Sequence, residues 1–163
     1  MIRPLKKEEF DTVIEIVNDN WKSVYAGYVA PELLEESGCA KRASELITDF
    51  NTKRLEEYVW EEAGQTLALL SIGNTEDADK PSAFEIWRIY IALIAQGKGI
   101  GGQLLAFAEQ RAIQKGYVEA VIWVFQENIR AIRFYQKYGY QIDKEVYLGS
   151  PYYTHGIRLM KKL

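Results

Sequence analysis

Apolar positions along the chain change their spacing several times, and each spacing predicts one kind of element. After a short strand at 1–5, residues 7–21 carry apolar side chains at helical spacing, so we predict an amphipathic helix there. Pro31 at a first helical position starts a short helix that ends near Gly38. A further helix follows, with its apolar face between residues 40 and 50, and ends at 51–52.

The middle of the chain is dominated by strands. Residues 55–62 and 65–72 predict a hairpin that turns at Ala63-Gly64. The stretch 73–81 is polar and rich in breakers, so we expect a surface loop. Residues 84–91 form the next strand, because aromatic and β-branched side chains fill it without a breaker.

The last half of the chain alternates helices and strands. A nearly continuous apolar run at 118–124 predicts a central strand covered on both faces. A helix comes before it and another after it, with Gly116 and Gly139 as their ends, and two closing strands complete the chain at 140–148 and 156–163. This order of elements predicts one mixed α/β domain that spans residues 1–163.

Composition limits the classes of function. The chain has 163 residues and a net charge of −3, which disfavours nucleic acid as a partner, since phosphate backbones require a concentrated positive surface. Cys39 is the single cysteine, so an internal disulfide and a thiolate metal cluster are excluded, and His155 is the single histidine, which argues against a histidine-built metal site. No run of eighteen apolar residues is present, and we expect no membrane partner and a cytoplasmic location.

A glycine-rich run joins the strand at 84–91 to the following helix. Four glycines within six residues turn the backbone sharply and let its amides point at one anionic group, to which the helix dipole and a lysine add positive charge. We therefore predict a phosphate-binding loop; the alternative is a strand-to-helix turn that is only rich in glycine. The residues are Gln96, Gly97, Lys98, Gly99, Ile100, Gly101 and Gly102.

Two other phosphate loops fit less well. Gly97, Gly99 and Gly102 match the dinucleotide-binding spacing, but that class wants an acidic residue at the end of the second strand, and Glu119 lies at the start of its strand. A nucleotide P-loop requires Gly-Lys followed by Ser or Thr, and the chain has no such run.

The spacing Gln96, Gly99, Gly101 after an apolar strand resembles the acetyl-CoA pyrophosphate loop of the GNAT superfamily of N-acetyltransferases. The segment from Asn128 to Tyr140 is similar to the second cofactor segment of that superfamily. The resemblance implies a mixed, mostly antiparallel sheet with two splayed central strands, flanked by helices. It also implies acetyl-CoA as co-substrate and direct transfer to an amine in a ternary complex.

The resemblance implies roles for individual residues. The cofactor would contact the glycine-rich run, the backbone near the end of the preceding strand, and the second segment, here Ile89, Tyr90, Ile91, Asn128, Ala131 and Tyr135. Tyr135 would protonate the departing CoA sulfur, or else be a core tyrosine bonded to a backbone carbonyl. Asn128 would bind pantetheine, cap its helix, or do both. The donor to the oxyanion would be a backbone N–H near Tyr90 or Ile91.

A base is needed as well, because an amine with a pKa of about 10.4 is almost wholly charged at pH 7. Glu85 is our candidate; the other interpretation is a charge paired with Arg88 or left exposed at the strand end. Strand alternation predicts Glu85, Trp87 and Ile89 on one face and Ile86, Arg88 and Tyr90 on the other.

The acceptor stays open. Trp21, Tyr25 and Tyr28 form a cluster that either contacts the substrate or packs internally. Acidic residues of the early helices either attract a polyamine or lysine, or form a solvated face; these are Glu32, Glu35, Glu36, Glu45 and Asp49. Residues 85–91, 147–149 and 159–160 are similar to bacterial polyamine N-acetyltransferases, but amino acids, peptide or protein amines and aminoglycosides also remain candidates, for a monomer or a homodimer. The alternative class is a sensor that binds acetyl-CoA without turnover.

Overall fold

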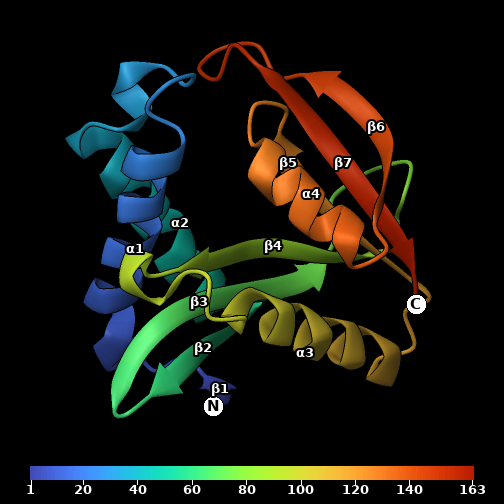
Figure 1. The fold of residues 1–163 in the computed structure, drawn as a ribbon, viewed down its shortest axis with the longest axis horizontal. Helices are drawn as coiled ribbons and strands as arrows, with labels where there is room; N and C mark the ends of the chain where they lie inside the picture. The colour runs from blue at the N-terminus through green and yellow to red at the C-terminus, as the bar shows by residue number, and fades with distance from the viewer.

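A seven-stranded, mostly antiparallel sheet in the order β1-β2-β3-β4-β5-β7-β6 forms the centre of the molecule (Figure 1). The structure is a computed structural model and describes all residues, 1–163. Its strands are β1 (Ile2–Pro4), β2 (Glu56–Glu62), β3 (Gln65–Asn74), β4 (Phe84–Ile91), β5 (Glu119–Phe125), β6 (Gln141–Tyr147) and β7 (His155–Lys162). Its helices are α1 (Phe10–Val24), α2 (Glu36–Thr52), α3 (Ile100–Gln114) and α4 (Ile129–Lys137), with single 3₁₀ turns at Lys7–Glu9, Pro31–Leu33 and Leu93–Ala95. The predicted mixed fold is confirmed.

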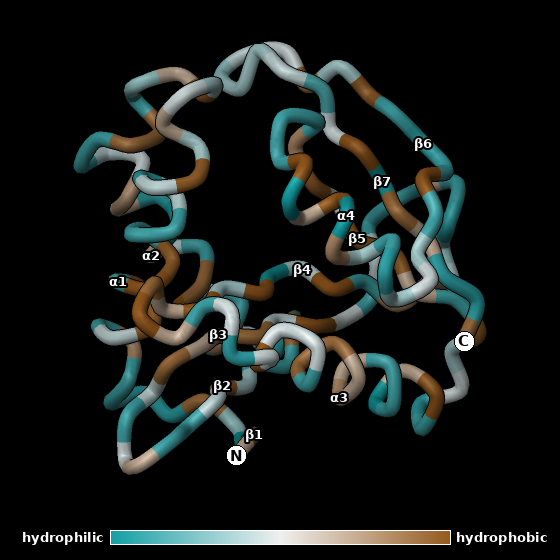
Figure 2. The backbone as a smooth tube through the Cα atoms, in the orientation of Figure 1, coloured by the Kyte–Doolittle hydropathy of each residue, from teal (hydrophilic) through white to brown (hydrophobic).

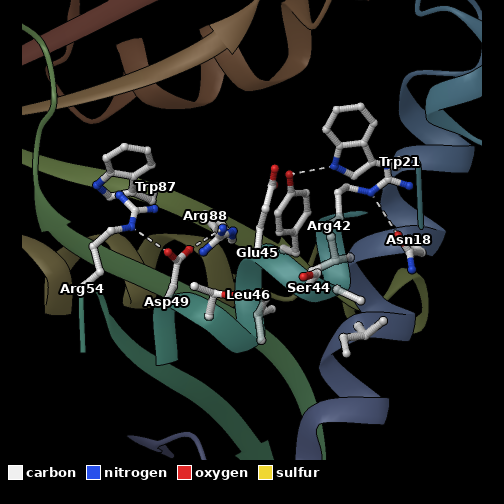
Figure 3. A pocket seen from close by; sticks show the side chains of 15 residues that line it. Asn18, Trp21, Arg42, Ser44, Glu45, Leu46, Asp49, Arg54, Trp87 and Arg88 are labelled. Atoms are coloured by element: carbon white, nitrogen blue, oxygen red, sulfur yellow. Dashed lines mark hydrogen bonds and ion pairs between the residues drawn. The ribbon is translucent and has the colours of Figure 1, made fainter. Parts of the chain in front are cut away.

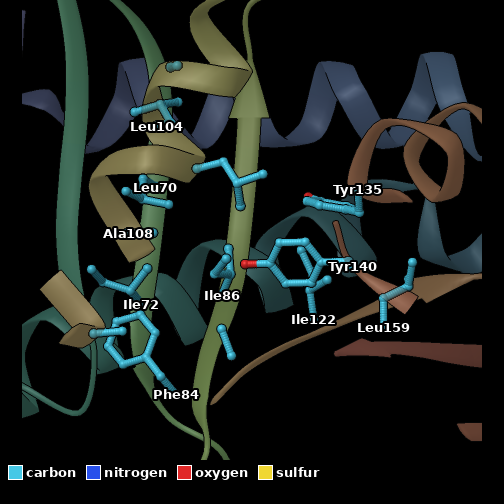
Figure 4. Packing of buried hydrophobic residues seen from close by; sticks show 14 of the residues in the cluster. Leu70, Ile72, Phe84, Ile86, Leu104, Ala108, Ile122, Tyr135, Tyr140 and Leu159 are labelled. Atoms are coloured by element: carbon cyan, nitrogen blue, oxygen red, sulfur yellow. The ribbon is translucent and has the colours of Figure 1, made fainter. Parts of the chain in front are cut away.

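Helices cover both faces of the sheet and create two cores. The larger core lies on the side of α3 and α4 and includes Leu70, Leu104 and Tyr135 (Figure 4). The smaller core lies under α1 and α2 and includes Val13 and Leu69. Neighbouring residues of β3 thus enter opposite cores, as strand geometry requires. Along α3, hydrophobic and hydrophilic segments alternate in the manner of a helix with one buried side (Figure 2).

The centre of the sheet opens between two neighbouring strands. β4 and β5 run parallel and pair only at Phe84 with Ala120 and at Glu85 with Val121. Beyond these pairs the strands diverge, and the rest of β4 has no strand partner on that side (Figure 1). The implied splaying of the central strands is confirmed.

A β-bulge in β4 changes which of its side chains lie on each face of the sheet. Arg88 pairs with Ser71 and Ile86 pairs with the next residue of β3, so Trp87 is an extra residue in β4. As a result, Ile86 enters the larger core, whereas Arg88 bonds Asp49 of α2 on the opposite face. The prediction that Ile86 and Arg88 share a face was wrong, because the bulge shifts the alternation by one residue.

The early helices also differ from the prediction. Gly38 does not end a helix but lies in the first turn of α2, after the short 3₁₀ turn at Pro31–Leu33. A Cβ at Gly38 would clash with the carbonyl of Leu33, so the glycine is needed for close packing. The helix predicted at 7–21 begins as a 3₁₀ turn and extends to Val24. None of the helices has both the length and the hydropathy that crossing a membrane requires.

We expect Gly38→Ala to lower the free energy of unfolding by about 1–3 kcal/mol, because the added methyl group overpacks the contact with Leu33. Gly27→Ala is the matched control, since a Cβ there has no neighbour within 4 Å, and its effect should stay within about 0.5 kcal/mol. Urea denaturation of both variants measures the difference. Equal midpoints for Gly38→Ala and the parent protein would contradict the packing role.

Candidate active site

A cavity of about 300 Å³ lies where β4 and β5 diverge, and we call it the sheet cavity. Twelve of its fifteen lining residues are hydrophobic, so it suits an apolar chain or an acyl group better than a free charge. Seven of the predicted site residues line it together, from α1, β4 and α4. They are Trp21, Tyr25, Ile89, Tyr90, Asn128, Ala131 and Tyr135.

The backbone of β4 presents unpaired polar groups to this cavity. The N–H of Ala92 donates to Leu67 in β3, and backbone groups alternate along a strand, so those of Ile89 and Ile91 face away from β3. The Ile91 carbonyl is already used, because it accepts hydrogen bonds from Asn20 Nδ2 at 2.9 Å and Gln96 Nε2 at 3.3 Å. Ile89 is therefore the better candidate for a backbone contact with a ligand.

Gln96 and Asn20 close the end of the opening. The Oδ1 of buried Asn20 accepts a hydrogen bond from Gln96 Nε2 at 3.2 Å, and Gln96 Oε1 accepts one from Arg130 at 3.2 Å. The side chain of Gln96 thus joins α1, β4 and α4. Sequence reasoning missed Asn20, although the signal was present as one polar residue on the buried side of α1.

The glycine-rich run has the geometry of an anion site. Gly97 and Gly99 have φ values of +78° and +81°, which glycine adopts without strain. None of the six backbone N–H groups of residues 97–102 donates to an acceptor in the protein. Since α3 starts at Ile100, its dipole and its free N–H groups add to the positive potential of the loop.

The other two glycines of the run have a packing role. A Cβ at Gly101 would lie 3.3 Å from the Phe134 ring, and one at Gly102 would clash with the Tyr138 hydroxyl. Both aromatic rings belong to the segment that forms and ends α4. The start of α3 can therefore approach α4 closely only because these two positions lack side chains.

Tyr135 is a largely buried tyrosine that lines the sheet cavity. It is 6% exposed, extends from α4 toward β4, and its hydroxyl has no hydrogen-bond partner in the protein (Figure 4). Burial raises the pKa of Tyr135, and the nearby Tyr90 adds to the effect, so the phenol keeps its proton at neutral pH. The Tyr90 hydroxyl accepts a hydrogen bond from Trp21 Nε1 at 3.0 Å.

A second cavity, of about 500 Å³, lies between α1, α2 and β4, and we call it the helix cavity (Figure 3). It shares four lining residues with the sheet cavity, so the two spaces adjoin: Trp21, Trp87, Arg88 and Tyr90. Asp49 bonds Arg54 at 2.6 Å and Arg88 at 2.7 Å inside it. Burial opposes ionisation of Asp49, but these two hydrogen bonds outweigh it and lower its pKa.

Some predicted residues lie outside both cavities. Glu85 is buried in the paired part of β4 and lines neither space, and burial raises its pKa to about 7 despite a hydrogen bond with Thr75. Tyr28 packs its ring edgewise on Phe125, and its buried hydroxyl has no partner. Sequence reasoning missed Glu57, which is buried beside Ser71 and Arg88 with its pKa raised to about 7 by burial.

Comparisons with known proteins agree with this geometry. The model of the acetyltransferase (GNAT) family matches residues 13–140. A spermidine N(1)-acetyltransferase of Thermoplasma acidophilum is 29% identical over 149 residues, which are 87% of this chain and 88% of that protein. A probable N-acetyltransferase of Mycobacterium tuberculosis is 28% identical over 92% of this chain and 84% of its own length.

Solved structures show the same fold. The PaiA N-acetyltransferase of Thermoplasma acidophilum, in complex with coenzyme A, superposes with a TM-score of 0.77 at 22% identity, over 100% of this chain and 98% of that one. An N-acetyltransferase of Staphylococcus aureus has a TM-score of 0.78 at 25% identity, over 99% and 97%. YncA of Salmonella typhimurium, solved with acetyl-CoA, has a TM-score of 0.76 at 18% identity, over 100% and 93%.

Fold and site together define an acyltransferase with a splayed sheet and a loop of unpartnered amides at the start of α3. The chain belongs to the GNAT family of acetyltransferases. It is an enzyme that uses acetyl-CoA as co-substrate. The alternative class, a sensor without turnover, is not favoured.

We expect Gly99→Ala to weaken CoA binding about tenfold or more, because φ of +81° strains alanine and shifts the unpartnered amides beside it. Gly64→Ala is the control: Gly64 has φ of +77° and no neighbour within 4 Å, as Gly99 does, but lies in the β2–β3 turn. Both variants should lose similar stability. Calorimetric titration then compares the CoA affinities of the two variants. Equal affinities would show that the glycine-rich run does not contact CoA.

Proposed function

We propose that the protein transfers the acetyl group of acetyl-CoA directly to a primary amine while both substrates are bound. The sheet cavity and the helix cavity adjoin at Trp21 and Tyr90, which supports this proposal. The sheet cavity suits a thioester, and the helix cavity beside it has room for an acceptor. Cys39 lines neither cavity and bonds Leu34 and Arg42, so no thiol is placed to take up the acetyl group first.

The binding roles follow from groups that the protein leaves free. We assign the diphosphate to the six unpartnered amides at 97–102, with Lys98 as an added charge. We assign the pantetheine arm to the backbone of Ile89 and to Asn128, which lines the sheet cavity with Ala131. Asn128 Oδ1 caps α4 by accepting from the Ala131 N–H at 3.2 Å, and its amide group keeps its own donors for the ligand.

In the proposed reaction the amine nitrogen attacks the thioester carbon and a C–N bond forms. The backbone near Tyr90 and Ile91 would stabilise the oxyanion. When the C–S bond breaks, the sulfur takes a proton from the Tyr135 hydroxyl, and the resulting phenolate, which the raised pKa makes a strong base, regains a proton from the nitrogen of the new amide. Trp21 walls the border of the two cavities, where the amine must enter, and Tyr25 lines the sheet cavity beside it.

Tyr135→Phe should lower kcat about 100-fold or more and leave the affinity for CoA nearly unchanged, because it removes one proton donor and little contact area. Thiol release and calorimetry measure the two quantities. Tyr140→Phe is the matched control, since the Tyr140 hydroxyl is also buried without a partner but lines neither cavity. Equal turnover of the two variants would show that Tyr135 is not the proton donor.

We propose that Glu85 is the general base that accepts a proton from the amine. Water must carry this proton, because the Glu85 carboxyl lies outside both cavities. A carboxyl with pKa of about 7 is ionised above that pH and can accept a proton from an ammonium near neutrality. Glu57 has a similarly raised pKa and lies beside Arg88, so it is the rival residue.

The dependence of kcat/KM on pH distinguishes the two carboxyls. The parent enzyme should lose activity as the pH falls below about 7, where Glu85 takes up a proton. Glu85→Gln should abolish this loss of activity at low pH and lower the maximal kcat/KM about tenfold or more. Glu57→Gln should keep the loss of activity at low pH. The reverse pattern would assign the role to Glu57.

A further inference from the structure

We infer that the acceptor amine also carries a carboxylate, which Arg42 binds in the helix cavity. The inference rests on the proposed function and names its substrate class. Three arginines line this cavity against two acidic residues, although the whole chain has a net charge of −3. Arg54 and Arg88 are both paired with carboxylates, so the third arginine, Arg42, carries the charge that a ligand can meet.

Arg42 is the arginine of the cavity that has no carboxylate within 4.0 Å. Its Nε donates to Asn18 Oδ1 at 3.0 Å, and its other two nitrogens donate to the Leu33 carbonyl and to Cys39 Sγ. These acceptors are neutral, so they fix the side chain without offsetting its charge. A guanidinium has five N–H groups, and at least two of them stay free for a ligand.

Aromatic stacking fixes the same guanidinium further. The Arg42 guanidinium carbon lies 4.3 Å from the centre of the Trp21 ring (Figure 3). A planar, immobilised guanidinium matches the two oxygens of a carboxylate, and little entropy is lost when they meet. The Arg42 guanidinium is thus a preformed anion site in the helix cavity.

The acidic groups of the cavity are poorly suited to hold a polyamine. Asp49 is shared between Arg54 and Arg88, and its charge is already neutralised. Glu45 has a side chain that is 53% exposed and lies 3.9 Å from Lys41, so water screens it. Neither offers a buried, unpaired carboxylate to an ammonium group. Asp49, predicted as part of a solvated or polyamine-attracting face, is instead a buried ion-pair partner.

The position of Arg42 also orients the acceptor. Trp21 stacks on Arg42 and donates to the Tyr90 hydroxyl, and both aromatic residues line the two cavities. A carboxylate held at Arg42 therefore leaves the amine end of the same molecule free to point across Trp21 toward the sheet cavity. Amino acids and short peptides have the required pair of groups, whereas spermidine has amines alone.

The test compares amines that differ only in the carboxylate. Thiol release from acetyl-CoA is measured with a panel of amino acids, each beside its carboxamide, and with L-lysine beside cadaverine and spermidine. We expect at least one amino acid to exceed its carboxamide about tenfold or more in kcat/KM. Arg42→Gln should remove this preference, because it lowers the rate with the amino acid far more than the rate with its carboxamide, and Arg42→Lys should restore part of it.

Lys22→Gln is the charge-matched control, because Lys22 is exposed beside Trp21 and should not alter the preference. Thermal unfolding checks that each variant is folded. Spermidine or cadaverine reacting faster than every amino acid, with equal losses for all amines in Arg42→Gln, would overturn the inference and leave the proposed function in place. No thiol release with any amine, despite CoA binding, would overturn the proposed function and with it this inference.

Discussion

The divergence of β4 from β5 after two paired positions is the constraint on which the rest of the structure depends. A strand that loses its neighbour inside a protein leaves backbone groups without partners, at about 1–3 kcal/mol for each one that stays buried. The protein satisfies one such group itself, since Asn20 and Gln96 both donate to the Ile91 carbonyl. Ile89 is left for a ligand, and a pantetheine chain with its two amides has the chemistry to take the place of the missing strand.

The glycine-rich run and the proposed acid are positioned by the same packing contact. Gly101 meets Phe134, Gly102 meets Tyr138, and Tyr135 lies between these two aromatic residues in sequence. The orientation of α4 that seats the aromatic rings on the glycines also turns Tyr135 into the sheet cavity. The distance between an anion held at the start of α3 and a group held at Tyr135 is thus set by the packing of two helices. A larger side chain at Gly101 or Gly102 would disturb both ends of the site.

Features that depend on near neighbours in sequence were predictable. The strand at 84–91 has unbroken β-branched and aromatic content, and the Asn128 cap needs only the N–H of Ala131 three residues away. The bulge at Trp87 depends on how β4 meets Ser71 and Ile72, and no periodicity within β4 contains that information. Gly38 shows the same limit, because its role is set by the carbonyl of Leu33 and not by its own helix.

Which charges of the helix cavity are paired could not be predicted from the sequence, for the same reason. Helical periodicity places Asp49 and Arg42 on α2, but the partners that decide their roles come from elsewhere: Arg88 from β4 for Asp49, and Asn18 from α1 for Arg42. Asp49 is neutralised by two arginines, and Arg42 is held by neutral acceptors only. Two residues about two turns apart on one helix thus differ in whether their charge is available to a ligand. Pairing, and not the formal charge of the chain, therefore determines which charges the helix cavity leaves available to a ligand.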